Sequence, residues 1–582
     1  LGSKSTAIGI NSLGSQNFTT ATDTYNTAVG FEAGANVTTG VQNTLIGSFA
    51  GDALTDSDYN VAVGQGAVGS DTLGSRSTGL GYGALANQNF TTATDTYNTA
   101  VGYEAGVAVT TGIRNTLIGG LAGVGLTTGG SNVALGYEAL KTEDAHGLNT
   151  AIGTQALFSL NAGADAYNVA VGYQAGAGVS TGVQNTLLGG LAGDSLSVGN
   201  KNIAIGYRSL SGDTKGNKNV AVGNFALSTQ NFTTATDVFN VGVGHGAGEG
   251  ITTGLGNALM GGLAGDALTD ADSNTAVGYL ALTADTLGDG STALGNRSLK
   301  TQNFSTAATS FNTAVGFQSG EFTTTGQSNV FVGYNCGQHN STGASNTFVG
   351  SAAGTGVSGA KITGSNNTSI GSGAGSVLQG AASSNTCIGA LAGDSITTGS
   401  SNIMIGEQSE ISASDGVNQI CIGIDINAGG NNNFSFGKAS NVVTNDFDAD
   451  ANWSRSSDER LKKNITNQSL GLDFINDLRT VKYNWKASNE LDSTDAQLAH
   501  LYKEDAADNE MNTDVVMHNF IAQEVKAALN TAGVSNFAGW NEDQNGVQQV
   551  SREMFVIPLV KAVQELSTAL DAALARIATL EG

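Results

Sequence analysis

A serine and a lysine five residues apart, Ser457 and Lys462, are the pair in this chain best suited to covalent chemistry. A serine hydroxyl is a weak nucleophile until a base takes its proton, and a lysine is such a base when its pKa falls toward neutrality. Burial or nearby cations lower a lysine pKa, and Arg460 and Lys463 are the nearest cations. The pair stands where a Gly-rich repetitive region ends and a globular composition begins, so it predicts a chain that removes its own C-terminal part. The alternative is that these basic residues only form a solvated face near a helix start.

The composition restricts the kind of protein that positions this pair. The chain has 582 residues with 83 glycines, one proline and 13% charged residues, and its net charge is −25. Glycine is at about twice its usual ~7%, yet no G-X-Y period exists and hydrophobic residues reach 40%, which excludes collagen and disfavours disorder. The acidity argues against nucleic acid as a partner, and no apolar run approaches the ~20 residues of a membrane span.

A repeat of about 17 residues fills residues 1–430 with 24 units. Each unit reads roughly N-T-A-[VI]-G-x-x-A-G, as at residues 26–34. The β-branched run predicts a short strand, the glycine a tight corner, and the asparagine a side-chain ladder from rung to rung. One rung cannot bury its apolar side alone, whereas many stacked rungs form a continuous core. The sequence therefore predicts a mostly β fold, a β-solenoid or β-roll, with a narrow interior of small aliphatic side chains.

The repeats resemble the head repeats of trimeric autotransporter adhesins, whose N-[ST]-x-A-[IV]-G-x-x-[AS] rungs form a left-handed parallel β-roll in a trimer. The unit here is longer, which leaves the handedness and any interleaving of three chains open. Some units carry insertions near a recurring Q-N-F-T-T motif, and we expect these loops to protrude sideways. Aromatic residues mark equivalent loop ends, where they either stack on sugars or anchor the loops: Tyr25, Tyr97, Tyr167, Phe239 and Phe311.

Metal and cofactor chemistry finds little support in the sequence. The three cysteines and five histidines have no spacing typical of a metal site. Cys387 and Cys421 occupy the third place of a unit, which predicts core packing, and two rungs separate them by roughly 10 Å, too far for a disulfide. The GxG tripeptides belong to the repeat and open no helix, so we expect no dinucleotide, cofactor or metal site.

The repeat stops near residue 431, and residues 431–456 form an Asn-rich transition. Residues 457–582 have a globular composition and predict a small α+β domain. After Pro558, apolar residues recur at alternating spacings of 4 and 3 through residues 558–581, which predicts a coiled coil. An amphipathic packing helix is the alternative.

Four motifs in the C-terminal part resemble the S74 peptidase family, the intramolecular chaperones of bacteriophage tail fibres and tailspikes. They are S-D-E-R-L-K-K-N-I at 457–465, L-D-F-I-N-D-L-R-T-V-K-Y-N-W-K at 472–486, H-N-F-I-A-Q-E-V at 518–525 and P-L-V-K-A-V-Q-E-L at 558–566. The resemblance implies a domain that trimerises a fibre, helps its β-structured shaft to fold and is then released by self-cleavage.

The same resemblance assigns the roles of individual residues. It implies cleavage between Ser456 and Ser457, with Ser457 as the nucleophile and Lys462 as its base. Arg460 and Asp458 are candidate supporting residues of this pair. His518 opens the third motif, where it either orients the pair or is a structural histidine.

The resulting hypothesis is a homotrimeric tail fibre of a virion, made in the host cytoplasm, that contacts a host-surface glycan or protein receptor. We expect other tail proteins to attach through a region upstream of residue 1. The only enzymatic activity predicted is serine-peptidase action on the chain itself, with no turnover activity in residues 1–430. The alternatives are a bacterial trimeric surface adhesin and a tailspike that degrades polysaccharide, although no singular pair of carboxylates supports the latter.

Overall fold

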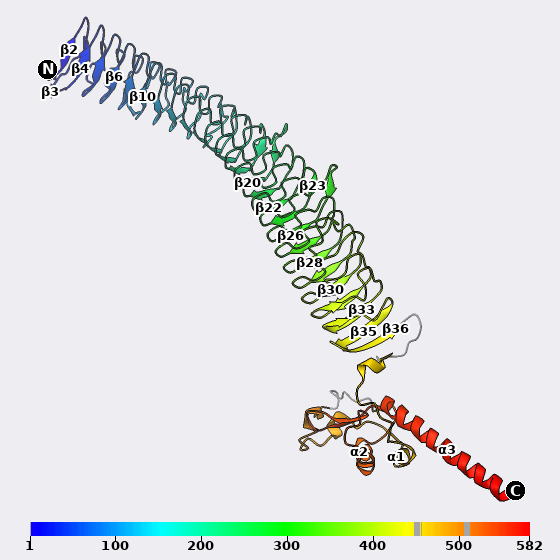
Figure 1. Ribbon diagram of the computed structural model, residues 1–582. Helices are drawn as coiled ribbons and strands as arrows, with labels where there is room; N and C mark the ends of the chain where they lie inside the picture. The colour runs from blue at the N-terminus through cyan, green and yellow to red at the C-terminus, as the bar shows by residue number, and fades with distance from the viewer. Residues whose placement is uncertain (1, 447–453, 456, 506–512) are drawn as a thin grey trace. The chain divides into compact units, whose positions relative to one another are not determined.

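The computed structural model describes residues 2–446, 454–455, 457–505 and 513–582. The chain divides into two compact units, Leu1–Ser456 and Ser457–Gly582. The first unit is a long β-solenoid, and Figure 1 shows its rungs stacked from β2 to β35. The second is small and contains three α-helices among the described residues. The predicted mostly β fold with a solenoid of ~17-residue turns is confirmed, and the C-terminal unit, predicted as a small α+β domain that ends in a coiled coil, contains a small helical region.

Each repeat supplies one short strand to a single parallel ladder. In β4 (Thr27–Val29) and β5 (Thr44–Ile46), every residue lies opposite its equivalent one repeat later. The other rung strands are β2 (Thr6–Ile8), β6 (Val61–Val63), β8 (Thr78–Leu80), β10 (Thr99–Val101), β11 (Thr116–Ile118), β12 (Val133–Leu135), β13 (Thr150–Ile152), β14 (Val169–Val171), β15 (Thr186–Leu188), β16 (Ile203–Ile205), β18 (Val220–Val222), β20 (Val241–Val243), β21 (Ala258–Met260), β22 (Thr275–Val277), β24 (Thr292–Leu294), β26 (Thr313–Val315), β27 (Val330–Val332), β28 (Thr347–Val349), β29 (Thr368–Ile370), β30 (Thr386–Ile388), β31 (Ile403–Ile405) and β33 (Ile420–Ile424).

The interior of the solenoid is a narrow column of side chains from the middle of each strand. Ala28, Leu45 and Ala62 succeed one another along it and are fully buried. Phe331 and Phe348 widen the column at one point, where their rings stack 5.6 Å apart. The side chains before and after the middle residue point outward because successive residues of a strand alternate between its faces.

A buried asparagine ladder runs beside this column. The Asn26 Oδ1 accepts from the Asn43 backbone N–H at 2.8 Å, and the Asn26 Nδ2 donates to the Gly40 carbonyl at 2.7 Å. The same pair of bonds recurs at Asn185, whose Oδ1 accepts from the Asn202 N–H at 2.9 Å. The ladder satisfies buried backbone groups that the short strands leave unpaired.

The glycine that follows each strand is required by the close approach of successive rungs. Gly30 has φ +139°, and a Cβ there would lie 2.5 Å from the Gly47 carbonyl oxygen. Other residues rarely adopt that φ, and the neighbouring atom is backbone that cannot move aside. This steric limit explains why glycine recurs at this place of the repeat.

The insertions form separate two-stranded parallel sheets beside the main ladder, and their loops are anchored at the base. In the copy at residues 88–95, Phe90 is 6% exposed while the tip at residues 91–93 is exposed. The buried Asp71 carboxylate accepts from the Gly74 and Phe90 N–H groups, both at 3.0 Å. The paired strands of the insertions are β1 (Gly2–Ser3) with β3 (Thr22–Asp23), β7 (Gly74–Ser75) with β9 (Thr94–Asp95), β17 (Gly216–Asn217) with β19 (Thr236–Asp237), and β23 (Gly288–Asp289) with β25 (Ala308–Thr309). A further pair, β32 (Ser409–Glu410) with β34 (Ile426–Asn427), lies near the end of the solenoid.

The parallel stack ends in an antiparallel cap within the region predicted as a transition. β35 (Asn433–Lys438) continues the parallel ladder from β33, and β36 (Asn441–Asp446) turns back against β35. The short β37 (Ser454–Arg455) pairs with β36. An antiparallel end covers the edge that a parallel stack would otherwise leave open for pairing with another chain.

The cysteines belong to the solenoid core. Cys336, Cys387 and Cys421 are fully buried and free. Burial raises the pKa of Cys336 and of Cys387 to about 12 and that of Cys421 to about 11. They therefore act as small apolar side chains rather than as nucleophiles.

The C-terminal unit has one small core and a long final helix. Leu470, Phe474, Val525, Leu529 and Phe555 lie at the centre of the core. The elements are η1 (Glu459–Leu461), α1 (Leu472–Asn476), β38 (Val481–Tyr483), η2 (Ser488–Glu490), η3 (Ala499–Leu501), β39 (Met517–Asn519), α2 (Ala522–Thr531), β40 (Trp540–Glu542), β41 (Gln548–Val550), η5 (Arg552–Phe555) and α3 (Val556–Glu581). None of the described helices is long and apolar enough to cross a bilayer.

Candidate self-cleavage site

The predicted nucleophile and base are joined by a hydrogen bond. Between them, the single turn η1 reverses the chain, and the Asp458 Oδ1 caps this turn by accepting from the Arg460 N–H at 2.9 Å. The turn returns residue 462 toward residue 457, and the Lys462 Nζ donates to the Ser457 Oγ at 2.7 Å. An amine and a hydroxyl at this distance are in place for proton transfer. Ser456, on the other side of the predicted scissile bond, lies outside the described residues.

The surroundings of this pair are open to solvent and carry a local ion pair. All residues from 457 to 467 are exposed in the single chain. Arg460 is one of the two cations nearest to Lys462 in the sequence. It forms an ion pair with Asp458, whose Oδ2 lies 2.6 Å from the Arg460 Nη2. The hydrogen bonds from Arg460 hold the pKa of the Asp458 carboxyl below its usual value. The Asp458 carboxylate therefore neutralises the Arg460 guanidinium within the turn.

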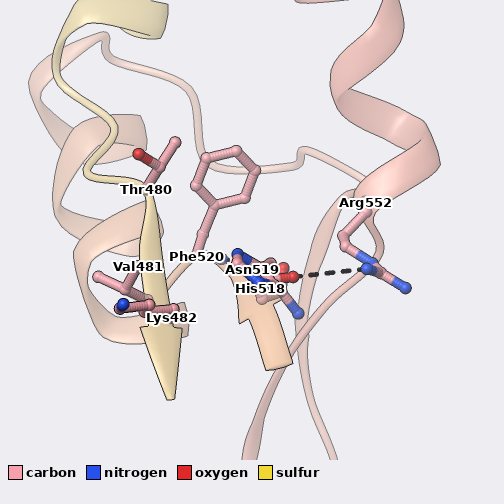
Figure 2. A pocket seen from close by; sticks show the side chains of 7 residues that line it. All are labelled: Thr480, Val481, Lys482, His518, Asn519, Phe520 and Arg552. Carbon is pink, nitrogen blue, oxygen red and sulfur yellow. Dashed lines mark hydrogen bonds between the residues drawn. The ribbon is translucent and has the colours of Figure 1, made fainter. Parts of the chain in front are cut away.

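His518 lies in a different part of the C-terminal unit. It sits on β39 opposite Lys482 of β38 and lines a pocket of about 450 Å³. Figure 2 shows the Arg552 guanidinium reaching the His518 carbonyl oxygen, which accepts from the Arg552 Nη1 at 3.5 Å. Among the described residues, no hydrogen bond or ion pair joins His518 to Ser457 or Lys462. These contacts favour the structural alternative for this histidine over an orienting role.

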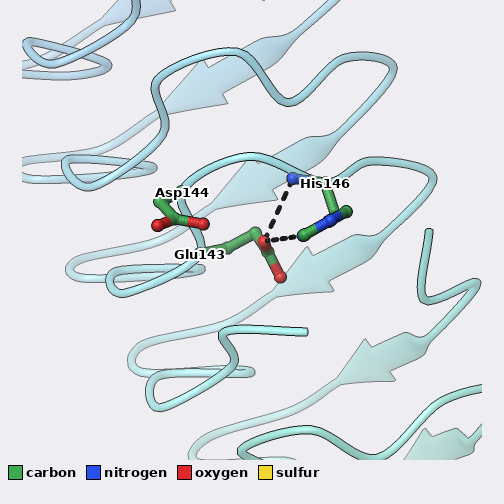
Figure 3. A group of neighbouring side chains, drawn as sticks. All are labelled: Glu143, Asp144 and His146. Carbon is green, nitrogen blue, oxygen red and sulfur yellow. Dashed lines mark hydrogen bonds and ion pairs between the residues drawn. The ribbon is translucent and has the colours of Figure 1, made fainter. Parts of the chain in front are cut away.

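One group of side chains in the solenoid has the types and proximity of metal ligands. The ligand atoms of Glu143, Asp144 and His146 lie within 4.8 Å of one another, as Figure 3 shows. The Glu143 carboxylate is buried, and its oxygens accept from the His146 N–H at 3.2 Å and the Ala162 N–H at 3.1 Å. Asp71 makes the same two kinds of backbone contact in its own insertion. We therefore interpret Glu143 as the carboxylate that closes a turn.

The buried carboxylates that close the insertions were not predicted from the sequence. Asp71, Asp213 and Asp285 each stand at the same short distance before the glutamine of a Q-N-F motif, and each is fully buried. The Gln230 Nε2 donates to the Asp213 Oδ2 at 2.6 Å, and the Gln230 Oε1 accepts from the Asn240 Nδ2 at 2.9 Å. The signal that would have found them is the fixed spacing of D-x-x-G to Q-N-F.

Comparison with known proteins identifies part of the C-terminal unit. Residues 457–534 match the family model of Peptidase S74, described as chaperone of endosialidase. No curated protein and no solved structure matches the chain. The class of protein is thus a long β-solenoid followed by a Peptidase S74 chaperone-of-endosialidase domain. Ser457 is the first matched residue, and α3, with the fourth motif of the sequence, lies beyond the matched range.

Proposed function

We propose that the chain is the fibre protein of a virion tail, a homotrimer whose C-terminal unit directs assembly and is then cut off by its own Ser457 and Lys462. The observation that carries this proposal is the 2.7 Å hydrogen bond between the Lys462 Nζ and the Ser457 Oγ, at the first residue of the matched domain. In this proposal the solenoid is the part that persists and contacts the host surface. The chemistry serves maturation of the chain itself.

The cleavage follows from the positions of these two groups. Lys462, in its neutral form, takes the proton of the Ser457 hydroxyl, and the Ser457 Oγ attacks the carbonyl carbon of Ser456. The C–N bond breaks as the Ser457 amine leaves with the proton that Lys462 returns. Water then hydrolyses the ester and leaves a carboxylate on Ser456. The exposed Lys462 of a single chain becomes a better base when a neighbouring copy buries it, which links the cut to assembly.

The outward face of the rung strands supports association of identical chains. The last residue of every three-residue rung strand is Val, Ile, Leu or Met, although this position faces outward. Ile46 is 38%, Leu135 44% and Met260 52% exposed in the single chain. A continuous aliphatic stripe of this kind is typical of an interface.

The final helix offers a second apolar face of the same kind. Leu559, Val563, Leu566, Leu570 and Ile577 of α3 are between 48% and 57% exposed. Their heptad spacing suits knobs-into-holes packing against parallel copies of the same helix. Three copies of one chain would cover both faces with one symmetry operation.

A removable assembly domain would also prevent errors of register when the solenoid folds. Successive rungs resemble one another so closely that a slip of one repeat costs little locally. A seed that aligns three chains suppresses this error, and its removal afterwards leaves the fibre kinetically trapped.

Cleavage is tested on a denaturing gel of the full chain beside Ser457→Ala and Lys462→Gln. We expect the wild type to yield a product that ends at residue 456, Ser457→Ala to stay intact, and Lys462→Gln to be slowed by about 10²–10⁴-fold through loss of the base. Ser454→Ala is the matched control and should cleave normally. An intact wild-type chain, or a cleaved Ser457→Ala, would refute the assignment.

The trimer is tested by the mass of the full chain in solution, from light scattering after size exclusion. We expect three copies for the wild type, and loss of the trimer for the double change Leu566→Asp and Leu570→Asp, which places six carboxylates in one seam. Asp571→Asn, a neutral change beside the seam, is the control. A monomeric wild type would contradict the proposal.

A further inference from the structure

A polar pocket of about 460 Å³ lies on the solenoid where β17 pairs with β19. Its lining differs from the aliphatic stripe because it consists mainly of amide and charged side chains. They are Gln184, Asn200, Lys201, Asn217, Lys218 and Asp237. No role in packing accounts for two lysines here, since the core lies inside the rungs.

The amide groups of the pocket are held in fixed orientations. The Asn200 Oδ1 accepts from the Val183 N–H at 2.8 Å, and the Asn217 Oδ1 accepts from the Asn200 N–H at 2.8 Å. The Asn217 Nδ2 in turn donates to the Asp237 Oδ1 at 3.3 Å. This side-chain ladder fixes the floor of the pocket to the backbone, as a preorganised binding site requires.

The charge of the pocket is positive on an acidic protein. Lys218 pairs with Asp237 and lies over the Phe239 ring, 4.9 Å from its centroid. The Lys201 side chain is exposed, and its ammonium donates no hydrogen bond among the described residues. The hydrogen bond from Lys218, with a smaller contribution from Lys201, lowers the pKa of Asp237. Two lysines and one aspartate leave one net positive charge, on a chain of net charge −25.

Equivalent places elsewhere on the solenoid lack this combination. At the earlier insertion, where β7 pairs with β9, Asp58 and Tyr59 stand in place of Asn200 and Lys201. At the later one, where β23 pairs with β25, the two positions hold Asp272 and Ser273. The Asp58 and Asp272 carboxylates accept the same backbone N–H bonds as the Asn200 amide, so the scaffold does not demand an amide. Replacing a carboxylate with an amide and adding a lysine changes what can bind there.

We propose that this pocket binds an acidic saccharide, a sugar ring that carries a carboxylate. One net positive charge matches one carboxylate, whereas a phosphate dianion would call for more. The Gln184 amide is exposed beside Lys201 and can bond ring hydroxyls, and the 56% exposed Phe239 offers an apolar ring beside Lys218 at the margin of the pocket. The inference rests on the proposed role of the solenoid in host-surface contact and names the chemistry of one ligand.

The test uses the full chain with a galacturonic acid tetramer as the probe, followed by saturation-transfer NMR and calorimetry. The fully methyl-esterified tetramer is the matched neutral probe, because it removes the charge and keeps the sugar. We expect the acid tetramer to bind, the ester to bind at least about fivefold more weakly, and binding of the acid to fall with salt. Lys201→Gln should weaken binding of the acid by a similar factor.

Lys361→Gln is the matched control, because Lys361 is also an exposed lysine near an aromatic ring, 5.3 Å from the centroid of Phe322, but lies outside the pocket. Equal binding of acid and ester, no effect of Lys201→Gln, or an equal loss in Lys361→Gln would overturn the proposal. A denaturing gel and a mass measurement on the same sample separate the hypothesis of a saccharide-binding pocket from the hypothesis of a self-cleaving trimeric fibre. A cleaved, trimeric protein that ignores the acid tetramer refutes the pocket alone, whereas an uncleaved monomer refutes the fibre.

Discussion

The solenoid and the C-terminal unit are stabilised in opposite ways. The solenoid buries about one side chain per strand and repeats this arrangement along its length, so each rung depends mainly on its two neighbours. The C-terminal unit instead gathers a few large side chains into one cluster around Phe474 and Phe555. We therefore expect a destabilising substitution in the solenoid to disturb only the neighbouring rungs. In the C-terminal unit, the same kind of substitution should destabilise the whole unit. Four substitutions test this contrast.

The largest effect is expected from Phe555→Ala in the C-terminal core. Phe555 is 6% exposed, and its ring centroid lies 4.9 Å from that of Phe520 and 5.2 Å from that of Phe537. Removing a buried aromatic ring of this kind costs about 3–5 kcal/mol, a large share of the stability of a small unit. We expect protease sensitivity throughout residues 457–582 and loss of cleavage.

Its neighbour Met554, 40% exposed, supplies the control Met554→Ala. A Phe555→Ala chain that resists protease and cleaves like the wild type would show that the unit does not depend on one core.

In the solenoid, we expect Gly189→Ala to destabilise only the rungs next to the substitution. Gly189 has φ +133°, and a Cβ would lie 2.5 Å from the Gly206 carbonyl oxygen. The strained backbone costs about 1–3 kcal/mol and the clash adds to it. Hydrogen exchange should rise in the rungs around residues 172–206 and stay unchanged several rungs away.

Gly163→Ala is the control, because no atom lies within 4 Å of its Cβ position. Hydrogen exchange that rises along the entire solenoid would contradict the expectation that each rung depends mainly on its two neighbours.

A smaller local effect is expected from Asn185→Ala in the asparagine ladder. The change leaves the Gly199 carbonyl and the Asn202 N–H without their side-chain partner. A buried unsatisfied group costs about 1–3 kcal/mol, seen as faster exchange of the Asn202 amide. The exposed Asn161 provides the control Asn161→Ala. An unchanged Asn202 amide would mean that water replaces the ladder.

The smallest effect concerns pH near the end of the solenoid. Burial, with a contribution from the neighbouring Asp394 carboxyl, raises the pKa of Glu410 to about 7. Because the folded state holds this proton more tightly than the unfolded state, the free energy of unfolding falls as the pH rises from about 4.5 to 7. Glu410→Gln should flatten this pH dependence and raise the thermal midpoint slightly at pH 8. A steeper pH dependence of stability in the Glu410→Gln variant would contradict the raised pKa of Glu410.

Much of the solenoid was predictable because its repeat reports directly on local structure. The strand, the glycine corner, the Asn26–Asn43 ladder and the buried Cys387 all follow from positions within one repeat. The antiparallel cap of β36 and the carboxylates that close the insertions were not predicted, because each depends on a pairing with a segment outside its own repeat.

The sequence by itself determined the rung, its period and the position of the Ser457–Lys462 pair at the boundary between two compositions. These features are local, and steric limits on glycine and the alternation of strand faces act on neighbours in the chain. Only the tertiary structure decided which distant groups meet. It joined the Glu565 carboxylate to the Leu472 N–H at 2.7 Å across 93 residues, and it brought Asp237 to Lys218 across an insertion. Such contacts depend on how the chain closes in space, which no single repeat of the sequence records.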